Sequence, residues 1–165
     1  MIPVDVDSLY RRYFPVIRAK SRRMLADAEE AQDVAQETFA RLCTARLDGR
    51  DARQVIAWIY RTSTHLAVDL LRRRGAHPTA EAGTVDGIRH HPAHEDALAT
   101  RELLGQFARR LRTGDLELLI MQRLDGMSQP QIALVLGTSE RTIRRRFLKL
   151  ERRLARITTE LSHGT

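Results

Sequence analysis

The sequence is short of cysteine, aromatic residues and lysine, and it contains no long apolar run. Its 165 residues include one cysteine, so no internal disulfide can form, as is usual in a reducing compartment. No apolar run reaches the roughly 20 residues that a membrane-spanning helix needs. The first residues also lack the basic and then apolar layout of a secretion signal. We therefore expect a cytoplasmic protein without membrane insertion.

Aromatic side chains make up only 5% of the chain, whereas 42% of the residues are hydrophobic. Because few large rings are available to fill one large core, two small helical bundles suit this composition better. We predict an all-α fold of two small helical domains joined by a flexible linker, with a helix-turn-helix in the second domain. The predicted ranges are 1–75, 76–99 and 100–165, and the linker is acidic and rich in Ala, Gly, Pro and His.

Basic residues outnumber acidic ones by 28 to 21, which gives a net charge of +7. Lys20 and Lys149 are the only lysines, so arginine supplies nearly all of the positive charge. The planar guanidinium offers a fork of donors that suits phosphates and guanine edges. The composition favours a polyanionic partner, although a solvated basic surface would have the same total charge. The distribution of the charges therefore matters more than their sum.

Helical spacing of apolar residues predicts helices over 8–25, 29–45, 54–74, 96–112 and 115–124. The second of these has the clearest stripe, made of Ala31, Val34, Ala35, Thr38, Phe39 and Leu42. Cys43 falls in an apolar helical stripe and is expected to be a buried, unreactive thiol. In the helix over 54–74, a second face presents Trp58, Arg61, Thr62, His65, Asp69 and Arg72.

The segment QIALVLGTSERTIRRRFLKL has the layout of a helix-turn-helix, in which the second helix enters the major groove of DNA. Ser128 is expected to cap the first helix, Gly137 to end it, and Ser139 to cap the second helix. The second helix should bury Ile143, Phe147, Leu150 and Leu154. Its early turns would then read bases through Arg141, Thr142, Arg144 and Arg145, while Arg146, Lys149, Arg152 and Arg153 would contact phosphates.

Two other functions are compatible with a DNA-binding module. A stand-alone helix-turn-helix transcriptional regulator would bind an operator as a dimer. An enzyme acting on nucleic acid would need a carboxylate cluster for metal or a supported nucleophile, and the sequence offers neither. His90, His91 and His94 are close together but have no partner cysteine, so we expect a polar linker rather than a metal site. We predict a protein that is not an enzyme, with no cofactor and no small-molecule substrate.

The stretch LDGMSQPQIALVLGTSERTIRRRFLKLERRL resembles region 4 of bacterial RNA polymerase sigma factors. AEEAQDVAQETFARL resembles the region 2 helix that docks on the polymerase, and AWIYRTSTHLAVDLLRRR resembles the region 2 helix that opens and reads the −10 element. Their order and spacing are similar to those of the small extracytoplasmic-function (ECF) sigma factors of the sigma-70 family. The resemblance implies core RNA polymerase and promoter DNA as partners, and a separately encoded anti-sigma factor as a possible third.

The resemblance also implies roles for individual residues. Core polymerase would be bound through Asp33, Gln36 and Glu37. The −10 element would be bound through Trp58, Arg61, Thr62, Thr64, His65, Arg72 and Arg73. The −35 element would be bound through Arg141, Thr142, Arg144, Arg145, Arg146 and Lys149. From the residues alone, the first set could equally be a solvated polar face, and Trp58 could belong to the core.

The chain departs from the family pattern at four places. His65 stands where the family often has asparagine, and Thr62-Ser63 where it often has Ile-Ala. Gln32 replaces a common acid and Cys43 a common tryptophan. The first two departures lie in the −10 helix, so they affect the expected promoter preference more than the fold.

Overall fold

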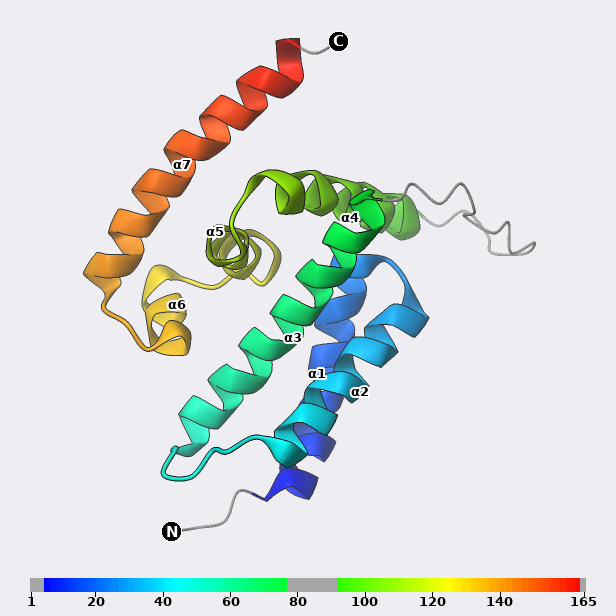
Figure 1. Cartoon of the computed structure of the whole chain (residues 1–165), viewed down its shortest axis with the longest axis vertical. Coiled ribbons are helices and arrows are strands. Elements are labelled where there is room, and N and C mark those ends of the chain that lie inside the picture. The colour runs from blue at the N-terminus through cyan, green and yellow to red at the C-terminus, as the bar shows by residue number, and fades with distance from the viewer. Residues whose placement is uncertain (1–4, 77–91, 164–165) are drawn as a thin grey trace, which may run out of the picture. The chain divides into compact units, whose positions relative to one another are not determined.

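The computed structural model of the chain describes residues 5–76 and 92–163. Within these ranges every regular element is a helix, so the predicted all-α class is confirmed (Figure 1). Two compact units are present, residues 1–109 and 110–165. This boundary lies later in the chain than residue 100, which was the predicted start of the second domain. The predicted linker over 76–99 overlaps helix α4 (Pro92–Arg110), which begins inside it.

The first unit is built on three helices that pack side by side, α1 (Val6–Leu25), α2 (Ala28–Thr44) and α3 (Ala52–Ala76) (Figure 1). An aspartate side chain caps the N-terminal end of each of these helices. Asp5 accepts from Ser8 N and Asp27 from Glu30 N, while Asp51 and Gln54 exchange side-chain to backbone hydrogen bonds. These bonds satisfy amide groups that have no partner inside a helix.

The core of this unit lies between α1, α2 and α3. All six residues of the predicted α2 stripe are buried, so that prediction is confirmed. Phe14 and Phe39 belong to one hydrophobic cluster, and their ring centroids lie 6.0 Å apart. Lys20 of α1 is also buried, with its Nζ 4.0 Å from the ring centroid of Tyr60 on α3. Lys20 and Tyr60 thus form a cation–π interaction inside the unit.

The prediction for Cys43 is wrong, because its side chain is exposed. The buried stripe of α2 runs through Leu42, and the next residue along a helix points about 100° away from its predecessor. Cys43 therefore follows the stripe in sequence but leaves it in space.

The second unit contains α5 (Thr113–Leu119), a π-helical turn η1 (Ile120–Leu124), α6 (Gln129–Leu136) and α7 (Glu140–His163). Its buried side chains come from all four elements, among them Leu116, Met121, Ile132, Ile143 and Phe147. The predicted helix over 115–124 ends differently from expectation. Its last turn is a π-helix closed by a hydrogen bond from Asp125 N to Ile120 O.

The turn between α6 and α7 follows the predicted chemistry. Ser128 and Gln131 form a capping box, with Ser128 N donating to Gln131 Oε1 at 2.8 Å. Gly137 ends α6 in the left-handed conformation with φ +62°. Ser139 Oγ then accepts from Thr142 N at 3.2 Å and starts α7. The helix-turn-helix is therefore built by local bonds that the sequence alone can specify.

Gly137→Ala tests the requirement for a left-handed residue at this turn. No heavy atom lies within 4 Å of the position a Cβ would take, so any loss must come from the backbone. We expect the free energy of unfolding of the second unit to fall by about 1–2 kcal/mol, and Gly137→Asn to cost less, since asparagine tolerates this conformation. Hydrogen exchange of α6 and α7 amides measures both. Equal stability of Ala and Gly would show that the turn relaxes.

Candidate nucleic-acid interface

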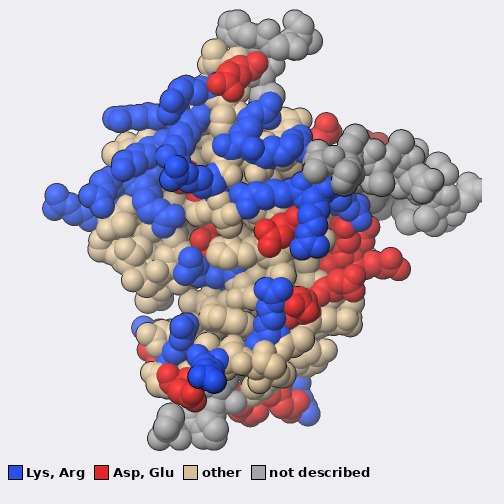
Figure 2. Space-filling view, viewed as in Figure 1, with Lys and Arg blue, Asp and Glu red and all other residues tan. Residues whose placement is uncertain are grey.

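Helix α7 presents one basic face to solvent. Arg141, Arg144, Arg145, Lys149 and Arg152 are exposed, whereas Ile143, Phe147 and Leu150 are buried. In Figure 2 the blue side chains gather along this segment, at the upper left of the view. The predicted division of α7 into an inner apolar side and an outer basic side is therefore confirmed for these residues, and Leu154 is only half-buried.

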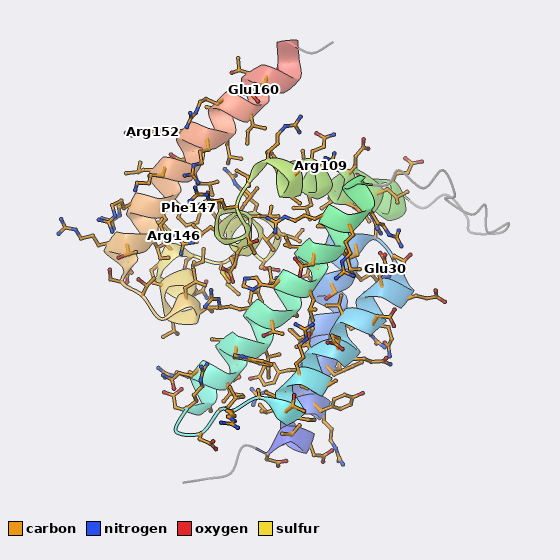
Figure 3. The ribbon with its side chains drawn as sticks, viewed as in Figure 1. Glu30, Arg109, Arg146, Phe147, Arg152 and Glu160 are labelled. Atoms are coloured by element: carbon orange, nitrogen blue, oxygen red, sulfur yellow. The ribbon has the colours of Figure 1, made fainter. Side chains whose placement is uncertain are left out.

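Two arginines of α7 point to their own unit instead. Arg146 Nη2 donates to Gly114 O at 3.1 Å, and Arg153 Nη1 forms an ion pair with Asp115 Oδ2. Both partners lie in the first turn of α5. Arg146 and Phe147 are neighbours on the ribbon in Figure 3, and Arg152 lies farther along the same helix. The phosphate roles expected of Arg146 and Arg153 are corrected accordingly, because these side chains hold α7 on α5.

Thr142 has a structural role at the start of α7. Its amide donates to Ser139 Oγ, and the two hydroxyl oxygens lie 3.0 Å apart. The side chain is half-buried. Its hydroxyl therefore already has a local partner at the end of the helix that would face DNA. Leu148, 54% exposed, adds an apolar side chain among the exposed arginines of the same face.

The residues expected to meet the −10 element lie along α3 but differ in exposure. Arg61 and Arg73 are exposed, and Trp58, Thr62 and His65 are half-buried. Trp58 packs against the hydrophobic cluster of the first unit with part of its ring. Within the expected set, the helix thus offers two exposed cations with partly covered side chains between them.

Thr64 and Arg72 depart from the expected set. Thr64 is buried, and its hydroxyl donates to Tyr60 O at 2.9 Å, so it does not lie on the surface. Arg72 is half-buried, and its Nε donates to Ala108 O of α4 at 2.9 Å. The expectation that Thr64 contacts DNA is therefore corrected. Arg72 has a contact within the unit that helical periodicity does not reveal.

The three residues expected to bind polymerase, Asp33, Gln36 and Glu37, are all exposed on α2. Glu37 pairs with Arg41 one turn later, at 2.7 Å. Asp33 lies at the edge of a groove between α1 and α2, which Arg18 and Arg22 line from the other side. These two arginines were not predicted, because the sequence does not say which turn of α1 lies opposite α2.

Glu30, Arg74 and Arg101 form a further charged cluster that sequence analysis missed. Their contacts join residues far apart in the chain, and no local motif signals them.

The described side chains include no group of three or more His, Cys, Asp or Glu residues able to hold a metal ion. His90 and His91, and the side chain of His94, fall outside the described part. No described helix is both long and apolar enough to cross a membrane.

The fold and this basic helix-turn-helix define a two-unit helical DNA-binding protein. Residues 9–77 match the family model of sigma-70 region 2, and residues 101–154 match that of sigma-70 region 4. The chain belongs to the sigma-70 family, in its ECF group, and is a transcription initiation factor.

Individual relatives agree with this assignment. The chain is 28% identical to the ECF RNA polymerase sigma factor SigM of Mycobacterium tuberculosis, over 96% of this chain and 79% of SigM. It is 30% identical to the RNA polymerase sigma-H factor of Pseudomonas aeruginosa, over 87% of this chain and 80% of that protein. A solved structure of CnrH in complex with the cytosolic domain of CnrY has a similar fold. Its TM-score is 0.56 at 24% identity, covering 97% of this chain and 89% of CnrH.

The neighbours Arg145 and Arg146 give a direct test of the two sides of α7. Arg146→Ala removes the donor to Gly114 O from a half-buried site, and we expect the second unit to lose about 1–2 kcal/mol of unfolding free energy. Arg145→Ala, at an exposed position, should change stability by less than about 0.5 kcal/mol. Urea unfolding followed by hydrogen exchange distinguishes them. Equal losses would contradict the assigned orientation.

Proposed function

We propose that this sigma factor binds core RNA polymerase through α2, recognises −10 DNA through α3 and −35 DNA through α7, and promotes strand opening. The observation that carries the proposal is the pair of faces that α7 presents. One side holds the apolar core, and the opposite side leaves Arg141, Arg144 and Arg145 exposed at the start of the helix. An α-helix fits the major groove, and bidentate guanidinium contacts favour guanine.

The proposed −10 set keeps Trp58, Arg61, Thr62, His65, Arg72 and Arg73, and omits the buried Thr64. The exposed part of an aromatic ring can stack on an unpaired base while neighbouring cations neutralise phosphates. Arg61 and Arg73 are exposed for the latter purpose. Phosphate contacts of both units would supply much of the affinity, so promoter binding should weaken as salt rises.

Polymerase docking is proposed for the exposed Asp33, Gln36 and Glu37. The opposite side of α2 is buried from Ala31 to Leu42, which directs these three side chains to solvent. CnrH was solved in complex with the cytosolic domain of CnrY, and we propose that a separately encoded protein, an anti-sigma factor, likewise binds this chain. The alternative function, an operator-binding dimer, requires tight duplex binding without polymerase.

Run-off transcription with core polymerase over a library of genomic fragments tests the function. We expect transcripts from a small set of promoters only when both core enzyme and this protein are present. A variant with Asp33, Gln36 and Glu37 changed to alanine should lose that transcription while remaining folded. Its matched control changes Ala40 and Thr44, which are exposed on the same helix. The absence of promoter-specific transcripts with folded protein, or tight operator binding by a dimer alone, would reject the proposal.

The −35 preference gives a second test. Arg144→Ala or Arg145→Ala should cost about 1–3 kcal/mol on the preferred −35 sequence and relax the preference at one base pair. Arg152→Ala, at an exposed position farther along α7, should weaken binding to all sequences to a similar degree and reduce the salt dependence. Competition binding of the holoenzyme to a randomised −35 duplex measures both. A uniform loss for Arg144 and Arg145 would make them phosphate contacts.

A further inference from the structure

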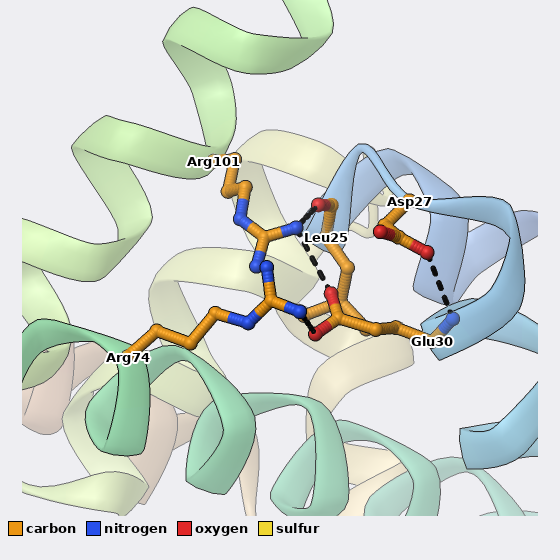
Figure 4. Close-up of polar contacts among 5 residues, drawn as sticks. All are labelled: Leu25, Asp27, Glu30, Arg74 and Arg101. Carbon is orange, nitrogen blue, oxygen red and sulfur yellow. Dashed lines mark hydrogen bonds and ion pairs between the residues drawn. The ribbon is translucent and has the colours of Figure 1, made fainter. Parts of the chain in front are cut away.

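The carboxylate of Glu30, near the start of α2, joins the end of α3 to the middle of α4 (Figure 4). Its Oε2 lies 2.9 Å from Nη1 of Arg101 on α4, and its Oε1 pairs with Nη2 of Arg74 near the end of α3. The same Nη1 of Arg101 donates to Leu25 O, at the last residue of α1. The side chains of Glu30 and Arg101 are only 12% and 16% exposed. We call Glu30, Arg74 and Arg101 the Glu30 cluster.

Helix α4 is fastened a second time, near its C-terminal end. Ala108 O, in the last turn of α4, accepts from Arg72 Nε at 2.9 Å. Carbonyl groups in the last turn of a helix have no partner within it, and the helix dipole attracts a cation to that end. Leu25 O has the same situation at the end of α1. Arginines therefore hold α4 on α1, α2 and α3 through groups that the helices themselves cannot satisfy.

These polar contacts matter because α4 lies less close to the other helices than they lie to one another. Among the described residues, the close helix pairings of the first unit are α1 with α2, α2 with α3, and α1 with α3. Arg101 Nη2 is also buried without an acceptor among the described residues. A buried donor without a partner costs free energy. This donor therefore destabilises the docked state of α4, and undocking would return the donor to water.

We propose that the Glu30 cluster holds α4 in a docked state that competes with DNA binding by the end of α3. Arg72 belongs to the proposed −10 set, and Arg74 is two residues away. In the docked state Arg72 is bonded to Ala108 O and Arg74 to Glu30. Each arginine has one nitrogen bonded to a protein acceptor, so a phosphate that binds the whole guanidinium fork displaces that acceptor, and the two events oppose each other. The region 4 match begins at residue 101, so undocking frees the first helix of that region. The DNA part of this inference rests on the proposed function.

A distance measurement in the free full-length protein tests the docking alone. Spin labels at Ala40→Cys on α2 and Ala99→Cys on α4, both exposed positions outside the cluster, are used with Cys43→Ser. Pulsed electron–electron double resonance should give a narrow distribution of label-to-label distances for the parent, and a longer and broader one for Arg101→Gln. The matched control Arg109→Gln removes an exposed charge from the same helix and should match the parent. Identical distributions for Arg101→Gln and the parent would overturn the proposal.

Affinity for a labelled single-stranded oligothymidylate, measured at one low ionic strength, tests the competition. Arg101→Gln removes a positive charge, which by itself weakens binding. We nevertheless expect binding to tighten about 5- to 10-fold, as for a parent docked about 80–90% of the time. Arg109→Gln should bind slightly more weakly than the parent, and Arg72→Gln should abolish the gain in the Arg101→Gln background.

The outcomes separate the two proposals. An undocked α4 in Arg101→Gln with no tighter DNA binding would refute the competition. If the distances and the DNA affinities come out as expected but the parent protein gives no core-dependent transcription, the proposed function is rejected and the docked state of α4 still holds. A variant that fails to fold is recognised by its circular dichroism, and Glu30→Gln then replaces Arg101→Gln in the distance measurement, because it removes the ion pair with Arg101 together with that to Arg74.

Discussion

The carboxylate of Glu30 is the constraint on which the first unit depends. At 12% exposure it has lost most of its water, and a charge in that position must be paired or it costs several kcal/mol. Two guanidinium groups supply the pairing, and they come from α3 and α4. Satisfying one charge therefore brings the start of α2, the end of α3 and the middle of α4 to one point. In a chain with few aromatic rings, such contacts supply orientation that large side chains provide elsewhere.

The second unit uses arginine in the same way. Its doublets Arg145-Arg146 and Arg152-Arg153 each place one side chain outside and the other against α5, since adjacent helical residues differ by about 100°. The inward members fix the rotation of α7 about its own axis. That rotation decides which arginines remain for DNA. A net charge of +7 thus says little about the interface until the arginines bonded within the protein are separated from those that are not.

Sequence alone predicted those parts of the fold that local chemistry determines. The apolar stripe of α2, the Ser128 cap and the Gly137 turn all depend on residues within a few positions of each other, and all are confirmed. The errors have a common cause in tertiary contacts. Arg146 was predicted to face phosphate because nothing in its own helix indicates Gly114 O as a partner, and the contact of Arg72 with Ala108 O was likewise not foreseen. Thr64 was assigned to the DNA-binding set by resemblance and Cys43 to a buried stripe by periodicity, and neither argument shows how wide the covered face of the helix is.

Protein acceptors for arginine also affect how a basic sigma factor behaves before it meets polymerase. A chain of this charge binds any polyanion through its phosphates, and a genome offers about 10⁶–10⁹ competing sites. An arginine that is bonded to a carbonyl or a carboxylate is less available to phosphates until a stronger contact displaces its protein acceptor. Docking of α4 withdraws Arg72 and Arg74 together, so it lowers non-specific affinity without removing any charge from the chain. Non-specific DNA must overcome the free energy of docking with phosphate contacts alone, whereas at a promoter the contacts of DNA and polymerase overcome it together.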